Sequence, residues 1–223
     1  MRKKILILGL VLVLVGVVSL IGYRVFFLKM VRVPSGSMAN TIIPGDHLVI
    51  RRVFGLPGRG DIVIFKYPDD PSTVYISRIV GLPGEKIEMG DRSIYINGSE
   101  LGEQRVTVKF DPDFEYGAME EISTEGSGPY RVFYFPRANA DVSRRPSDVV
   151  EMSFGTKEPF RIPDHHYFVM GDNRDNSIDS RMRGSVPRES IWGKATRIYW
   201  SSNLDKKSHQ EKIRWERINT GVK

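Results

Sequence analysis

The 223-residue chain contains no cysteine, which excludes disulfide bonds and thiolate chemistry. It also lacks charge of one dominant sign, because 33 Lys and Arg stand against 27 Asp and Glu and the basic residues are scattered along the sequence. Without a basic stripe, we expect no nucleic-acid partner. Sustained helical periodicity is missing beyond the N-terminus, so the bulk of the chain is not an α-helical bundle.

One long apolar run is present, because residues 5–23 carry no charge. As a helix these residues would extend about 28 Å, close to the thickness of the hydrocarbon core of a bilayer. The run is longer than the apolar core of a cleaved signal peptide, and no small-x-small cleavage pattern follows it. Basic residues precede it at 2–4, which favours a cytoplasmic N-terminus. We therefore predict one N-terminal transmembrane helix, with the lipid bilayer as a partner.

The remaining chain consists of short apolar runs broken by Pro and Gly, the pattern of a mainly β protein. Between residues 88 and 163 the composition shifts toward Asp, Glu, Ser, Gly and Pro, which indicates an inserted subdomain. We predict a membrane anchor over 1–29, a β core formed by 30–87 and 164–223, and an insertion over 88–163. The predicted strands cover residues 47–53, 61–67, 73–80, 93–96, 107–110, 130–135, 166–170 and 195–200, with a last edge strand within 212–218.

A serine-rich turn, Pro-Ser-Gly-Ser-Met at 34–38, begins eleven residues after the apolar run. A serine becomes a nucleophile when one group accepts its proton and others stabilise the negative charge on the attacked carbonyl oxygen. Ser37 would attack, while the Ser35 hydroxyl and the Ser37 backbone N–H would form an oxyanion hole. The same composition is typical of an ordinary turn, so this segment alone leaves both interpretations open.

A second polar segment, residues 171–181, follows a predicted strand and is dense in Asp, Asn, Ser and Arg. It lacks the spacing and closing Glu of an EF-hand, which disfavours calcium. We interpret it as a polar shell around a buried catalytic group. The nearby His165 and His166 are adjacent on a strand and point to opposite faces, so we expect no metal and no cofactor.

Taken together, these segments resemble bacterial type I signal peptidase, a Ser/Lys protease family also called leader peptidase. The resemblance implies a mostly antiparallel β catalytic core interrupted by a variable β subdomain. It further implies that Ser37 is the nucleophile and that Ser35 contributes to the oxyanion hole. Ser177, Asp179 and Arg181 are the implied supporting residues. Five segments carry the resemblance, in the order of the family: 34–38, 44–46, 59–65, 75–84 and 171–181.

The general base of the family is a lysine just before the arginine of the segment 75–84, and here that position holds Ser77. A buried lysine amine can be neutral and accept a proton, whereas a hydroxyl offers no comparable acceptor. Three explanations stay open. The chain is a natural or engineered inactive form, another group replaces the base, or a water held by Ser77, Ser177 and Asp179 relays the proton. The candidate replacements are Lys66, His47 and Lys86.

The resemblance implies a membrane-anchored serine endopeptidase that removes N-terminal signal peptides from exported preproteins. It would be a single-pass protein of the bacterial cytoplasmic (inner) membrane, with its catalytic domain on the extracytoplasmic side and an extended substrate in its groove. The alternative is an impaired pseudo-peptidase that binds preproteins or a partner peptidase without cutting, because Ser77 replaces the lysine. A self-cleaving repressor of related chemistry is disfavoured by the apolar run and by the lack of a DNA-binding region ahead of Ser37.

Overall fold

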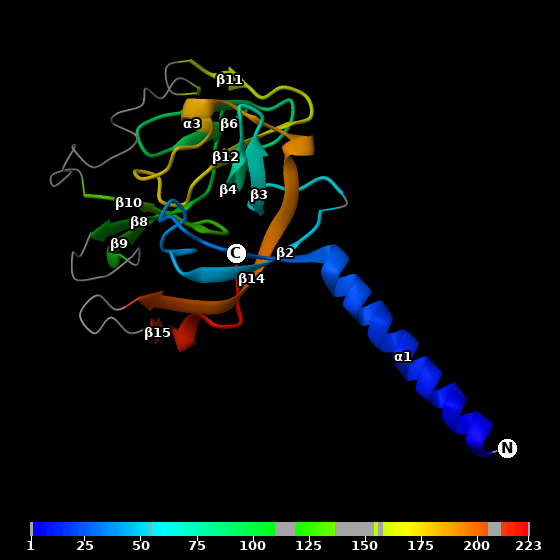
Figure 1. Ribbon diagram of the computed structural model, residues 1–223. Helices are drawn as coiled ribbons and strands as arrows, with labels where there is room; N and C mark the ends of the chain where they lie inside the picture. Colours follow the sequence, from blue (N-terminus) through cyan, green and yellow to red (C-terminus); the bar gives the residue numbers. More distant parts are fainter. Residues whose placement is uncertain are drawn as a thin grey trace.

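The structure is a computed structural model that describes residues 2–53, 55–109, 119–136, 154–155, 158–204 and 211–222. Its N-terminal helix α1 (Arg2–Phe27) projects away from a β-rich body (Figure 1). Apolar side chains along α1 are exposed, among them Leu10 at 72% and Val18 at 60%. Within the described ranges, no helix is long and apolar enough to qualify as a membrane span. Residues 5–23 thus form part of a helix, as predicted, but the prediction that this helix spans a membrane stays a prediction.

The main sheet of the described chain has nine strands in the order β1-β2-β14-β3-β4-β12-β13, with β15 and β16 also paired to β14. All of its pairings are antiparallel. Side chains of β2 alternate between buried and less buried, as expected for a strand with one buried face. The strands are β1 (Leu28–Arg32), β2 (Asp46–Arg51), β3 (Ile62–Tyr67), β4 (Asp70–Gly81), β12 (His166–Met170), β13 (Val186–Pro187), β14 (Ile191–Leu204), β15 (Glu211–Ile213) and β16 (Thr220–Gly221).

Two smaller sheets lie beside the main one and come largely from the range predicted as an insertion. One has the order β11-β5-β6-β7, and the other has the order β10-β8-β9 with β10 parallel to β8. Their strands are β5 (Lys86–Met89), β6 (Ile94–Ile96), β7 (Ser99–Glu100), β8 (Gln104–Lys109), β9 (Glu120–Glu125), β10 (Arg131–Tyr134) and β11 (Phe160–Arg161). Short helical segments are α3 (Ser180–Arg183), η3 (Arg188–Ser190) and η4 (Trp215–Arg217).

The prediction of a mainly β protein is confirmed, and each of the eight predicted internal strands overlaps an observed one. Phe110, the end of one predicted strand, lies outside the described residues. The last predicted strand is right only at its start, because β15 ends at Ile213 and η4 follows. Arg214 turns inward there, and its guanidinium donates to the Ser201 hydroxyl at 2.8 Å and to the Pro44 carbonyl at 2.7 Å. The predicted anchor extends to residue 29, whereas β1 already begins at Leu28.

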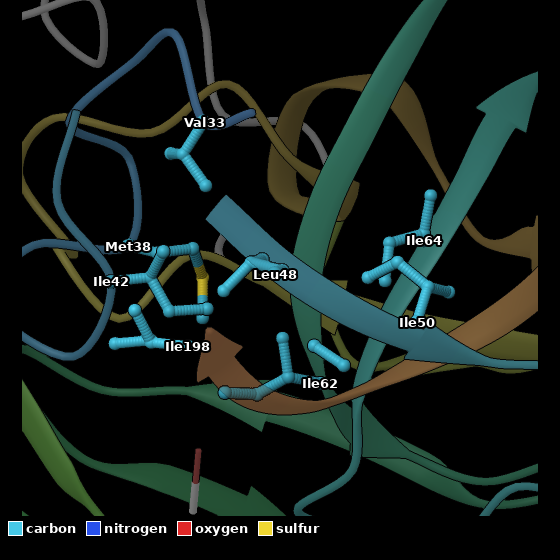
Figure 2. Packing of buried hydrophobic residues seen from close by; sticks show 9 residues of the cluster. Val33, Met38, Ile42, Leu48, Ile50, Ile62, Ile64 and Ile198 are labelled. Carbon is cyan, nitrogen blue, oxygen red and sulfur yellow. The ribbon is translucent and has the colours of Figure 1, made fainter. Parts of the chain in front are cut away.

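A hydrophobic cluster joins the main sheet to the loop that carries Ser35 and Ser37. Figure 2 shows Leu48 of β2 close to Met38 and Ile42 of that loop. Met38 is 1% exposed and directly follows Ser37, so its burial holds Ser37 against the sheet. The cluster consists of Val33, Met38, Ile42, Leu48, Ile50, Ile62, Ile64, Ala195 and Ile198.

Replacing the fully buried Leu48 with alanine should lower the free energy of unfolding by about 2–5 kcal/mol, because the truncated side chain leaves a cavity. Leu56→Ala removes the same atoms from a side chain that is 80% exposed, and it should change that free energy by less than about 0.5 kcal/mol. Urea unfolding of both variants, followed by tryptophan fluorescence, measures the difference. Equal losses in the two variants would contradict the packing of Leu48.

Candidate active site

The serines of residues 34–38 lie on the loop between β1 and β2. Ser35 is exposed and Ser37 is half-buried, and their hydroxyl oxygens are 3.4 Å apart. The Gly36 carbonyl accepts from the Ala39 N–H at 3.1 Å, which makes the loop a tight turn. The loop thus presents two neighbouring hydroxyls near the surface, while Met38 fixes it from below.

The segment 171–181 holds this loop by its backbone. The Asn173 N–H donates to the Ser37 carbonyl at 3.1 Å, and the Asn173 side-chain amide donates to the Gly36 carbonyl at 3.1 Å. The Asp172 N–H lies 3.4 Å from the Met38 sulfur, to which it donates. Two segments that are far apart in the sequence therefore form one unit around Ser37.

Gly171 lies where the two segments come closest. A Cβ atom at this position would lie 2.3 Å from Ser177 Oγ and 2.5 Å from the Ser37 carbonyl oxygen, far inside normal contact distances. Glycine is therefore required for this close approach. Ser177 itself is 2% exposed, so its hydroxyl lies in the interior just behind the serine loop.

Ser77 lies on β4, opposite Val63 of β3, and is 5% exposed. The next residue, Arg78, is paired with Met170 at the end of β12. Ser77 therefore precedes, on β4, the residue that pairs with the last residue of β12, and Gly171 follows that last residue. Ser37 and Ser177 both contact the position of Gly171.

Asp179 is fully buried at the N-terminus of α3 and accepts several hydrogen bonds. Its donors are the Gly171 N–H at 2.9 Å and the Arg181 guanidinium, with Nε at 2.8 Å and Nη2 at 2.9 Å. Burial alone would raise the pKa of Asp179, but the charge of Arg181 and these N–H donors outweigh it and hold the pKa below its ordinary value. Asp179 is therefore an ionised group that holds Gly171 in place.

A buried ion pair links the strand of Ser77 to the segment 171–181. Arg78 donates to both carboxylate oxygens of Asp172, from Nε at 2.7 Å and from Nη2 at 2.6 Å. Thr41 Oγ1 donates to the same carboxylate at 2.6 Å, and the Tyr130 ring covers the guanidinium at 4.4 Å. Arg78 and Asp172 are 1% and 0% exposed, so each charge depends on the other.

A second buried pair, Arg174 with Glu103, joins the segment 171–181 to the small sheets. Arg174 Nη1 donates to the Glu103 carboxylate at 2.8 Å, and Arg174 Nε donates to the Gly171 carbonyl at 3.2 Å. Burial by itself would lower the pKa of Arg174, but the Glu103 carboxylate outweighs it and the pKa is raised. Arg174 therefore remains a cation and serves as a structural link.

The candidate replacements for a lysine base make their contacts elsewhere. Lys66 Nζ donates to the Pro71 carbonyl at 2.5 Å, the His47 ring packs edge-on against Tyr199 at 5.8 Å, and Lys86 is exposed on β5. In the part of the chain that the structure describes, none of these contacts reaches Ser37 or Ser77. Among the same residues, no group of three or more His, Cys, Asp or Glu side chains is arranged to hold a metal ion.

Two residues that organise the site were not singled out from the sequence, Arg78 and Gly171. One available indication was the charge of Arg78 between Ser77 and the apolar Ile79, because an arginine inside a buried strand requires a partner. Which of several carboxylates supplies that partner depends on the register between β4 and β12, and the sequence does not show that register.

Comparison with known proteins places the chain among signal peptidases. The family described as signal peptidase, peptidase S26, matches residues 4–200. Signal peptidase I of Pseudomonas fluorescens is 32% identical over 212 residues, which cover 83% of this chain and 69% of that protein. Signal peptidase I of Rickettsia prowazekii (strain Madrid E) is 33% identical over 206 residues, which cover 81% and 75%. A crystal structure of a signal peptidase I from Enterococcus faecalis V583 matches 64% of this chain and 98% of that one at 26% identity, with a TM-score of 0.37 that is too low to support an argument about the fold.

The lowered pKa of Asp179 predicts how stability depends on pH. An unfolded Asp has a pKa of about 3.9, so the ionised carboxylate stabilises the folded state fully above that pH. The stabilisation is lost as the pH falls through the folded-state pKa. Asp179→Asn should be less stable than the parent at neutral pH and should lose less stability between about pH 5 and about pH 2.

Urea unfolding across this pH range provides the measurement. Asp69→Asn is the matched control, because the Asp69 side chain is 74% exposed, and this variant should follow the pH profile of the parent. If Asp179→Asn also followed that profile, the role given to the Asp179 carboxylate would be wrong.

Proposed function

The chain belongs to the signal peptidase I family, peptidase S26, and from this premise we propose that Ser37 is its nucleophile. As a signal peptidase I it is a serine endopeptidase that cleaves signal peptides from preproteins. The observation that carries the proposal is the position of Ser37, with its hydroxyl 3.4 Å from that of Ser35 and its carbonyl held by Asn173. A peptide in extended form would bind along this loop.

In the proposed reaction, Ser37 Oγ bonds to the carbonyl carbon of the scissile peptide bond and loses its proton. The Ser35 hydroxyl and the Ser37 N–H donate to the oxygen that becomes negative. The C–N bond then breaks, the amine leaves with a proton, and water hydrolyses the resulting ester to regenerate Ser37. We assign Ser177, Asp179 and Arg181 to positioning, because Asp179 holds Gly171, against which Ser177 and Ser37 both pack.

The proposed reaction needs a group that accepts the proton of Ser37. We propose that Ser77 stands at the position of the family's lysine, and its burial on β4 directly before Arg78 supports this assignment. A hydroxyl there can hold a water molecule that carries the proton away, but it is not itself an effective base. Loss of general-base catalysis typically lowers a rate by about 10²–10⁴. We therefore propose a slow peptidase whose rate is limited by this proton transfer.

A second candidate function is a pseudo-peptidase that binds preproteins without cutting. It is favoured by the state of the charged groups nearest the serines, because Asp172 and Asp179 are each bound to an arginine. The pKa of Asp179 is held below its ordinary value by Arg181 and its N–H donors, so this carboxylate is a poor proton acceptor. The two candidates share the binding site and differ only in turnover.

We further propose that α1 anchors the chain in the bacterial cytoplasmic membrane, with the β domain on the extracytoplasmic side. Support comes from the uncharged residues 5–23 and from the exposed apolar side chains along α1. The division into an anchor over 1–29, a core from 30–87 and 164–223, and an insertion over 88–163 is part of the same proposal. Within that insertion, residues 110–118, 137–153 and 156–157 lie outside the described residues.

Cleavage of a preprotein by the detergent-solubilised full chain tests the reaction. Ser77→Lys should raise the cleavage rate by about 10²–10⁴, because it supplies the missing base. Ser37→Ala should abolish cleavage in both the parent and the Ser77→Lys background. Cleavage products are quantified by mass spectrometry, which also locates the bond that is cut.

The outcomes separate the candidates. Slow cleavage by the parent that is lost in Ser37→Ala supports the peptidase, whereas cleavage by Ser77→Lys alone supports the pseudo-peptidase. Lys86→Ser is a control for a lysine–serine exchange at an exposed position, and it should leave the parent rate unchanged. If cleavage persisted in Ser37→Ala, Ser37 would not be the nucleophile.

The proposed anchor is tested by membrane fractionation. The full chain should stay in the membrane pellet after carbonate extraction, and the double variant Leu12→Lys, Val15→Lys should move to the supernatant. Each lysine near the middle of a membrane helix opposes insertion by about 2.5–3.5 kcal/mol. Ile122→Lys changes a 56% exposed residue of β9 and should stay in the pellet. A parent chain that carbonate releases would rule out the anchor.

A further inference from the structure

A cavity of about 400 Å³ lies where the chain passes from α1 into the main sheet. It is lined by Lys29 of β1, Arg52 just after β2, Arg188 of η3 and Trp192 of β14. Figure 1 shows α1 running into the main sheet near β2 and β14, and the connection is made by β1, which pairs with β2. The cavity is separate from the serine site, since none of its lining residues belongs to the segments 34–38, 75–84 or 171–181.

The charge of the cavity is positive. Three cationic side chains line it against one carboxylate, that of Glu189. The Arg188 guanidinium is fixed by backbone carbonyls, with Nη2 2.8 Å from the Gly55 oxygen and Nη1 3.2 Å from the Ile191 oxygen. These carbonyls orient the guanidinium without neutralising its charge. The excess of cationic side chains among the lining residues favours an anionic ligand, and guanidinium and ammonium groups suit phosphate.

The surroundings of the cavity point to a lipid surface. Phe27 ends α1 and Lys29 follows two residues later, so the cavity sits at the end of the apolar helix. The Lys29 ammonium lies 4.9 Å from the centre of the Trp192 ring, and tryptophan and lysine are both typical of the headgroup level of a bilayer. Leu56, which is 80% exposed, follows the Gly55 that binds Arg188.

We propose that this cavity binds the phosphate of an anionic phospholipid headgroup. The proposal rests on the proposed placement of α1 in the membrane, because only then does the cavity face headgroups. Lys29 and Arg52 would contact the phosphate, and Leu56 would enter the acyl boundary. A lipid bound here would hold the β domain at a fixed height and orientation over the membrane.

Native mass spectrometry of the detergent-solubilised full chain tests the proposal, with phosphatidylglycerol as the anionic probe and phosphatidylcholine as the zwitterionic one. The parent should retain phosphatidylglycerol more tightly than phosphatidylcholine. Lys29→Gln and Arg52→Gln should each weaken retention of phosphatidylglycerol about fivefold, the contribution of one cation near an anionic lipid. The double variant should bind the two lipids about equally.

Lys86→Gln is the matched control, because it removes one exposed positive charge on β5, outside the cavity lining, and should retain phosphatidylglycerol like the parent. Equal retention of phosphatidylglycerol by the parent and the double variant would overturn the proposal. So would inorganic phosphate that binds the parent as tightly as the lipid does, because the site would then recognise free phosphate.

Failure of this proposal can be told apart from failure of the proposed function. Lipid retention is measured without substrate, so it does not depend on whether Ser37 cuts. Conversely, Lys29→Gln and Arg52→Gln lie outside the serine site and should leave preprotein cleavage in lipid-free detergent unchanged. Loss of cleavage in these variants would show that the cavity serves the reaction rather than the lipid, and would overturn the assignment.

Discussion

The ion pair of Arg78 with Asp172 is the interaction on which the rest of the site depends. Both side chains are at most 1% exposed, so neither charge would be tolerated in the interior without the other. The pair ties β4, which carries Ser77, to the residues on either side of Asp172 that hold the serine loop. Thr41, on the far end of that loop, donates to the same carboxylate. One buried pair therefore fixes three segments that are distant in the sequence.

The buried pairs of arginine and carboxylate side chains hold the site in place, but they do not supply a general base. A general base that works near neutral pH needs a pKa close to that pH. Beside Gly171, Asp179 instead has a pKa that Arg181 holds below its ordinary value, which makes its carboxylate unsuited to accepting a proton. Asp172 is bound by Arg78 through both of its oxygens and serves to make the site rigid. In the proposed site, Ser37 would be the nucleophile and Ser35 an oxyanion donor, and with Ser77 at the position of the base the proton would have to leave through solvent.

Much of the fold could be predicted from the sequence, because long strands such as β3 and β14 carry apolar runs that a short pattern reveals. Several of the missed strands gave no such indication: β9 is exposed at all six positions, and β7, β11, β13 and β16 have only two residues each. The longer β1 and β5 were missed as well. For the site, the serines of 34–38 and 171–181 could be named from their motifs. Their convergence on Gly171 could not, because it depends on long-range contacts such as those of Asn173 with the Gly36 and Ser37 carbonyls. The parallel pairing of β10 with β8 is also non-local and has no counterpart in a short pattern.

No linker separates α1 from β1, since Phe27 ends the helix and Leu28 is already paired with Arg51. Ser37 follows nine positions later, and nine residues extend at most about 30 Å. So short and firmly paired a connection limits the distance between the end of α1 and Ser37. It keeps the Ser37 hydroxyl within about 30 Å of the helix end. If Ser37 attacks as proposed, a peptide bond presented farther from that point stays out of reach whatever its flanking sequence.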